Sequence, residues 1–347
     1  MGDRREDDVG FASSRRSFLK GASVLGVSAL ASGFSLFSQE AYGTQGLVVP
    51  TRNLVGHRAY VHGENEALSA DLSVNADEVF YNASLTKLVT LARVFEEIDS
   101  GNLDWNDKIR VSSHAIIQSS HRAEFEELTV RQACEMAGSA SLNDAAIALA
   151  ERVSAQKNIT LGLTRSQSIA LENIFVHDHM MPLVQSLGMD NTLCTNATGL
   201  PLYSVRDKKN GYETMELPNN YSTLNDMAKI TSHILSEYSD YMDVFAQPFV
   251  SVNTFRSRMH NGNLLLPDNE KKGADPYDGV VGMKSGFINA SGHHLICVKE
   301  NEGKTIVSMT IGSNGSDRAE DQRRILDLAV GTYKARSALQ HEAGLTL

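Results

Sequence analysis

Apolar side chains recur at intervals of three and four residues from Ser84 to Asp99, which is the clearest periodic pattern in the chain. This spacing gathers them on one face of a helix, so we predict an amphipathic α-helix that ends before Gly101. Similar patterns predict five further helices, over Thr129–Met136 with Thr129 as N-cap, Asn143–Val153, His177–Leu187, Thr223–Ser236 and Asp321–Lys334. Most of the predicted helices therefore lie in the middle of the chain.

Strand-like patterns lie on either side of these helices. Short strands are predicted between Asn53 and Phe80, and three more over Val280–Met283, His294–Val298 and Thr305–Ile311. The polar run Glu300–Lys304 predicts a hairpin turn, and two longer polar segments, Ser204–Asn220 and Pro267–Asp278, are predicted to be loops. We therefore predict an α+β fold, in which an antiparallel sheet is built from the N- and C-terminal segments and a helical lobe is inserted between them.

The N-terminal segment is predicted to be a targeting segment rather than part of the folded domain. Paired arginines within Ser14–Lys20 precede a weakly apolar run, Gly21–Phe37, and Ala41–Gly43 fits a cleavage site. This pattern resembles a twin-arginine secretory signal. The run is shorter than the ~20 apolar residues that a membrane span needs. We expect an exported protein, periplasmic or otherwise extracytoplasmic, that meets the membrane only transiently through this segment.

Composition and charge narrow the class of protein further. The 347 residues are 41% hydrophobic and 21% charged, which excludes a disordered or collagen-like chain. The net charge of -10 argues against a general nucleic-acid binder. Three cysteines, Cys134, Cys194 and Cys297, make neither a disulfide framework nor a metal knuckle. The only histidine pairs are His177–His179 and His293–His294, and such pairs are more often unliganded, so no metal is expected.

Three short motifs carry the candidate chemistry, and they occur in the order Ser84–Lys87, Ser141–Asn143 and Lys284–Gly286. They fit the Ser-x-x-Lys, Ser-x-Asn and Lys-Ser/Thr-Gly set of β-lactamases and penicillin-binding proteins. Taken alone, each also fits a structural role, the two serines as helix caps and the third motif as a turn. Their order, and the kind of element on which each is predicted, favours the chemical interpretation.

The first motif provides a nucleophile and a base. Ser84 opens the periodic helix, and a three-residue offset places Lys87 one turn further on the same face, where its amine can reach the hydroxyl. A serine hydroxyl needs such a base. Burial and a nearby like charge, for which Lys284 is the candidate, would lower the lysine pKa enough for it to serve. The backbone N–H of Ser84 is free at the helix N-terminus to hold an oxyanion.

The other two motifs supply groups for the substrate and the leaving group. Ser141 can pass a proton to a leaving amine, and Asn143 can hold a substrate carbonyl or orient the lysine. Lys284 and Ser285 suit a substrate carboxylate, because a cation and a hydroxyl both donate hydrogen bonds to it. Gly286 allows substrate backbone to approach closely. The next backbone N–H, that of Phe287, is the candidate second oxyanion donor.

From about Arg52 to Tyr333 the chain resembles the serine-type D-alanyl-D-alanine carboxypeptidases, the low-molecular-mass penicillin-binding proteins. The resemblance rests on Tyr81–Lys87, Leu128–Arg131, Ser141–Ala146, Leu187–Thr192, Asn196–Leu200, Tyr221–Ala228 and Gly282–Phe287. Two positions depart from the family's usual pattern: Leu142 replaces a more frequent glycine, and Ser285 a threonine. We assign residues 1–43 to the signal peptide, 44–335 to the peptidase domain and 336–347 to a short tail.

The resemblance implies a β-lactamase/DD-transpeptidase-like fold and acyl-serine chemistry on peptidoglycan stem peptides, with β-lactam antibiotics as covalent inhibitors. It implies no metal and no organic cofactor. The alternatives are a DD-endopeptidase that cuts cross-links, a class A-like β-lactamase, for which Glu172 is the nearest candidate deacylating residue, and a non-catalytic penicillin-binding scaffold. A scaffold would have a damaged motif set, yet Ser84, Lys87 and Lys284 are all present. A carboxypeptidase is preferred to an endopeptidase because the loop Pro267–Asp278 can close the cleft beyond Lys284.

Overall fold

The computed structural model describes residues 55–63, 72–118, 127–155, 163–201, 219–252 and 257–342. All of them belong to the second of two units into which the chain divides, Val48–Leu347. The predicted signal segment and most of the predicted loop Ser204–Asn220 lie outside the described residues. In the part that is described, no helix has both the length and the apolar character of a membrane span.

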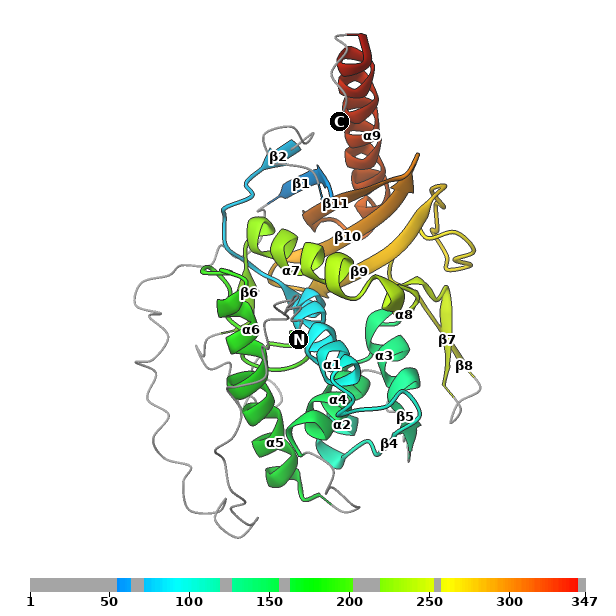
Figure 1. Cartoon of the computed structure of the whole chain (residues 1–347). Coiled ribbons are helices and arrows are strands. Elements are labelled where there is room, and N and C mark those ends of the chain that lie inside the picture. Colours follow the sequence, from blue (N-terminus) through cyan, green and yellow to red (C-terminus); the bar gives the residue numbers. More distant parts are fainter. Residues whose placement is uncertain are drawn as a thin grey trace, which may run out of the picture. The chain divides into compact units, whose positions relative to one another are not determined.

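Strands from the two ends of the chain pair into one five-stranded antiparallel sheet (Figure 1). In spatial order they are β2 (Leu72–Val74), β1 (Gly56–Val61), β11 (Lys304–Ser313), β10 (Gly292–Asn301) and β9 (Val280–Ile288). The predicted hairpin turn joins β10 to β11, with Glu302 and Gly303 both at positive φ. The predicted α+β architecture is confirmed. Strand β9 is longer than predicted because its pairing with β10 continues to Ile288 opposite Gly292.

The helical lobe lies between the two groups of strands in the sequence. Its helices are α1 (Lys87–Asp99), α2 (Ser113–Ile117), α3 (Val130–Gly138), α4 (Asn143–Ser154), α5 (Arg165–Ile174), η5 (Phe175–Met180), α6 (Met181–Ser186), α7 (Leu224–Glu237), η6 (Ser239–Tyr241) and α8 (Asp243–Ala246). Short ladders join β3 (Phe80–Tyr81) to β6 (Tyr221–Ser222), β4 (Lys108–Ile109) to β5 (Leu128–Thr129), and β7 (Phe249–Val252) to β8 (Ser257–His260). The predicted N-cap Thr129 forms a capping box with Gln132.

Two of the longer helices differ from the sequence prediction, and the short helices α2, η6 and α8 were not predicted. Helix α5 was not predicted, because its buried face carries Ser168 and Glu172 beside Ala170 and so lacks an apolar period. It begins with a capping box of Thr164 and Gln167. The closing helix α9 spans Arg318–Glu342, beyond the predicted end at Lys334, since no glycine or proline interrupts the sequence there.

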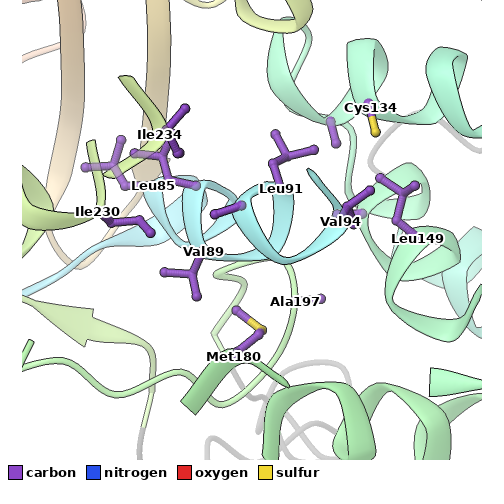
Figure 2. Packing of buried hydrophobic residues seen from close by; sticks show 14 of the residues in the cluster. Leu85, Val89, Leu91, Val94, Cys134, Leu149, Met180, Ala197, Ile230 and Ile234 are labelled. Atoms are coloured by element: carbon purple, nitrogen blue, oxygen red, sulfur yellow. The ribbon is translucent and has the colours of Figure 1, made fainter. Parts of the chain in front are cut away.

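Two buried clusters cover the two faces of the sheet. Helix α9 packs on one face through Leu326 and Ala329, against Leu295 and Ile306 of the sheet. The larger cluster joins the other face to the helical lobe, with α1 at its centre. Helix α1 is buried on more sides than an amphipathic helix would be: α7 contributes Ile230 and Ile234 near its start, and α3 and α4 pack further along it (Figure 2). This burial fixes the start of α1, where the first motif lies.

Candidate active site

The first motif forms a tight turn that leads into α1. Ser84 lies in the 3₁₀ turn η3 (Ala83–Thr86), directly after β3 and before the α-helix. Ala83 has a φ of 47°, and Thr86 Oγ1 donates to its carbonyl oxygen at 2.9 Å. The edge strand β9 packs against this turn. A Cβ at Gly286 would lie 3.3 Å from the Ser84 nitrogen, so the third motif reaches the first by close backbone approach.

Lys87 is completely buried and its amine has three oxygen neighbours. Nζ lies 2.9 Å from Ser84 Oγ, which is the contact that the motif spacing predicts. It also donates to Asn143 Oδ1 at 2.8 Å and to the Thr198 carbonyl oxygen at 2.8 Å. The second motif therefore orients the lysine, one of the two roles expected for Asn143. At 2.9 Å the Ser84 hydroxyl is within reach for direct proton transfer.

Burial sets the protonation of the two lysines. It lowers the pKa of Lys87 to about 7, against an opposing effect of the Asp144 carboxylate, which raises it. The pKa of Lys284 lies well below its usual value, first because of burial and then because of the positive charge of Lys87. Burial and a nearby like charge were the two expected causes, and burial is the larger cause at both lysines.

The second motif sits in a strained loop between α3 and α4. Ser141 has a φ of 62°, which is uncommon for a residue with a Cβ and marks many functional sites. The N-cap of α4 is Leu142, so the structural interpretation of Ser141 as the cap is wrong. The Leu142 side chain is buried in the main core cluster, so the larger residue at this position is accommodated by the core.

The third motif lies on β9, the edge strand, as expected. Lys284 is fully buried and its ammonium donates to the Ser285 carbonyl oxygen at 2.9 Å. Ser285 points at Gly262, where a Cβ would come within 1.8 Å of Ser285 Oγ. The Phe287 ring is half exposed and stacks on His293 at 4.2 Å between centroids. The motif therefore combines a buried lysine with close packing at two glycines, Gly286 within the motif and Gly262 beside it.

The loop Asn196–Leu200 contributes to the site, although the sequence did not predict a role for it. Asn196 Oδ1 accepts from the backbone nitrogens of Thr198 and Gly199, which folds the loop so that the Thr198 carbonyl meets Lys87. Gly199 has a φ of 82°, and a Cβ there would lie 1.7 Å from the Ala83 carbonyl oxygen. This stretch is part of the family resemblance, which could have indicated its importance, but no role was predicted for the loop.

The candidates for a deacylating glutamate and for metal ligands have hydrogen-bond partners elsewhere in the fold. Glu172, the residue that a class A-like β-lactamase would need, is buried, with Oε2 2.9 Å from His114 Nε2 and Oε1 accepting from the Ala197 nitrogen. His294 Nε2 lies near Ser291 Oγ and the Tyr81 carbonyl oxygen. Among the described residues, no three His, Cys, Asp or Glu side chains form a potential metal site.

Comparison with known proteins agrees with this geometry. A model of the D-alanyl-D-alanine carboxypeptidase family matches residues 72–315. The D-alanyl-D-alanine carboxypeptidase DacF of Bacillus subtilis is 26% identical over 274 residues, which cover 75% of this chain and 58% of that relative. The chain thus spans less than two thirds of that relative's length.

Solved structures establish the fold. The ampicillin-bound penicillin-binding protein D2 of Listeria monocytogenes has a TM-score of 0.59 and 23% identity, over 79% of this chain and 96% of that one. The D-alanyl-D-alanine carboxypeptidase DacD of Francisella tularensis has a TM-score of 0.62 and 21% identity, over 85% and 76%. The expected β-lactamase/DD-transpeptidase-like fold is therefore confirmed.

Proposed function

Because this chain belongs to the D-alanyl-D-alanine carboxypeptidase family, we propose that it releases the terminal D-alanine from peptidoglycan stem peptides through an acyl intermediate on Ser84. One observation carries the proposal above all others. The buried Lys87 amine lies 2.9 Å from Ser84 Oγ and is held there by Asn143 and Thr198. A serine paired with a lysine of lowered pKa is an activated nucleophile.

Acylation follows from this pair. Neutral Lys87 takes the proton of the Ser84 hydroxyl as Oγ attacks the carbonyl carbon of the penultimate D-alanine. The backbone nitrogens of Ser84 and Phe287 donate to the oxyanion that forms. The C–N bond then breaks, and the leaving amine receives a proton from Lys87 through the Ser141 hydroxyl. The products are an ester on Ser84 and free D-alanine.

Substrate binding uses the third motif. Lys284 and Ser285 hold the terminal carboxylate, which supplies the opposite charge that favours the charged form of the buried lysine. Asn143 holds a substrate carbonyl, and Gly286 lets the peptide backbone lie against β9. These contacts select a free C-terminus over an internal peptide bond.

Water then attacks the ester carbonyl carbon, and Lys87 takes a proton from it. As the bond to Ser84 Oγ breaks, Lys87 returns that proton to Oγ, which releases the shortened peptide and restores the enzyme. A β-lactam enters the same sequence, but its leaving nitrogen stays attached through the ring and blocks the path of that water. We therefore propose that β-lactam antibiotics acylate Ser84 and persist there. This agrees with the ampicillin-bound form of the Listeria relative.

Two incubations test the function. Purified full-length protein is given a pentapeptide monomer in one and a cross-linked dimer in the other, with the Ser84→Ala variant as control. We expect free D-alanine from the monomer and none from the variant. Cleavage of the dimer without release of D-alanine from the monomer would identify an endopeptidase instead.

We further propose that the protein acts outside the cytoplasm, in building the cell wall, after export through the twin-arginine route. The basis is the signal-like pattern around Arg15 and Arg16. Replacing both with lysine should leave the protein in the cytoplasm, as cell fractionation would show. Equal export of the variant would refute the route but not the activity.

A further inference from the structure

The Lys87 amine is held from two directions by elements that are distant in the sequence. Asn143 reaches it from the start of α4, and the Thr198 carbonyl reaches it from the loop Asn196–Leu200. A hydrogen-bond acceptor positions a donor only as firmly as the acceptor itself is fixed. What fixes these two acceptors therefore decides where the amine sits relative to Ser84.

On the loop side, the fixing group is Glu172 of α5. Its Oε1 accepts from the Ala197 nitrogen at 3.0 Å, one residue before the carbonyl that meets the lysine. The Ala197 carbonyl accepts from Thr90 Oγ1 of α1 at 2.8 Å, and Figure 2 shows Ala197 beside that helix. The backbone at Ala197 is therefore anchored on both its donor and its acceptor side.

On the other side, the fixing group is the end of α2. Asn143 Nδ2 donates to the Gln118 carbonyl at 3.3 Å, and the Gln118 nitrogen bonds back to the carbonyl of His114. His114 in turn lies 2.9 Å from the second carboxylate oxygen of Glu172. The contacts close into a ring that runs from Lys87 through Asn143, α2 and Glu172 to Thr198 and back to Lys87.

We propose that Glu172 and His114 are positioning residues for the proposed acylation, which hold the Lys87 amine in line with Ser84 Oγ by closing this ring. Both side chains are over nine-tenths buried, so neither contact can be exchanged for water without cost. Breaking the pair frees the loop and α2 to move independently. The inference rests on the proposed function and extends it to two residues that touch no substrate.

A neighbouring network offers a matched control. Ser168, one turn before Glu172 on α5, donates to Glu151 of α4, and Ser112 at the start of α2 donates to the same oxygen at 2.7 Å. This network joins the same three helices through buried polar groups, but the hydrogen bonds among Ser112, Glu151 and Ser168 do not include Glu172, His114 or the Ala197 backbone. The Ser168→Ala variant therefore shows how loosening these helices affects acylation when the ring stays intact.

The experiment compares Glu172→Ala, His114→Ala and the conservative His114→Gln with Ser168→Ala in full-length protein. Acylation by a fluorescent penicillin is measured from pH 5.5 to 9 and normalised to folded protein by thermal unfolding. We expect both ring-breaking variants to acylate at least about ten-fold more slowly, which is part of the 10²–10⁴-fold that a positioned acid–base group contributes. Their pH midpoint should move upward, because a looser, wetter pocket desolvates Lys87 less. His114→Gln should recover most of the rate.

The charged groups that act on Lys87, Asp144 of α4 and Lys284 of β9, are intact in every variant. A lower rate per folded molecule with an unmoved midpoint, or an equal change in Ser168→Ala, would overturn the inference. Should Glu172→Ala fail to fold, His114→Ala decides the question. If the unaltered protein is not acylated at Ser84, the proposed function itself fails, which is a different result from normal acylation in all variants.

Discussion

The rate of penicillin acylation should depend on pH through Lys87, and this is the sharpest consequence of the structure. Burial lowers the pKa of this lysine from 10.5 to about 7, which corresponds to a free-energy difference of about 5 kcal/mol between its two protonation states. At pH 7 about half of the molecules then carry the neutral amine, compared with roughly one in 3,000 for an unperturbed lysine. The fold thus raises the fraction of usable base about a thousand-fold.

The assay is the second-order rate constant for a fluorescent penicillin between pH 5.5 and 9. The base must be neutral, so the rate should rise about ten-fold per pH unit below the midpoint, near pH 7, and level off above it. Asp144→Asn supplies a directional check. The Asp144 carboxylate raises the pKa of Lys87, so its removal should move the midpoint to lower pH.

Three results would refute this reasoning. A rate that is flat from pH 6 to 8 would mean that Lys87 is not the base. A midpoint above pH 9 would mean that burial does not depress its pKa in solution. Movement of the Asp144→Asn midpoint to higher pH would contradict the assigned sign.

Three further substitutions test the site. Ser84→Ala should abolish acylation while the free energy of unfolding stays within about 1 kcal/mol, because no more than a cap-sized contact is lost; acylation that persists would point to another serine. Lys284→Ala should lower catalytic efficiency by about one to two decades on substrates with a free carboxylate, since a charge-assisted contact contributes roughly 1.5–3 kcal/mol. An equal loss on amidated substrates would show that Lys284 acts on the chemistry instead. Gly199→Ala should displace the nucleophile turn, because its Cβ would lie 1.7 Å from the Ala83 carbonyl; we expect a lower melting temperature and slower acylation, and unchanged values for both would show that the loop can yield there.

Several parts of the structure could be predicted from the local sequence. The three-residue spacing of Ser84 and Lys87 guarantees that the two side chains share a helix face, whatever surrounds them. Period-two and apolar runs near both ends required a sheet, and the polar run at Glu300–Lys304 required a turn between strands that pair. Thr129 caps α3 as predicted, and α7 begins directly after Thr223, where its helix was predicted to begin. Apart from the pairing of β1 with β11, each of these features depends on contacts within a few residues.

Helix α5 shows where such local reasoning fails. Two of its three buried positions, Ser168 and Glu172, are polar. Polar residues bury only when hydrogen-bond partners satisfy them. Ser168 finds Glu151 on α4, and Glu172 finds His114 on α2 and the Ala197 backbone. A polar buried face has no apolar periodicity, so the sequence pattern predicts neither this helix nor its role in the site. Both are visible only in the tertiary structure.

Tertiary structure also determined the hydrogen-bond partners and the pKa of Lys87. The sequence placed it beside Ser84, but its other two partners, Asn143 and Thr198, lie 56 and 111 residues away along the chain. Its lowered pKa comes from complete burial, which is a property of the packing around α1 rather than of the motif. The sequence therefore determined which groups could do the chemistry, and the packing of distant segments determined their protonation and aim, because desolvation and hydrogen-bond geometry depend on neighbours that local sequence does not specify.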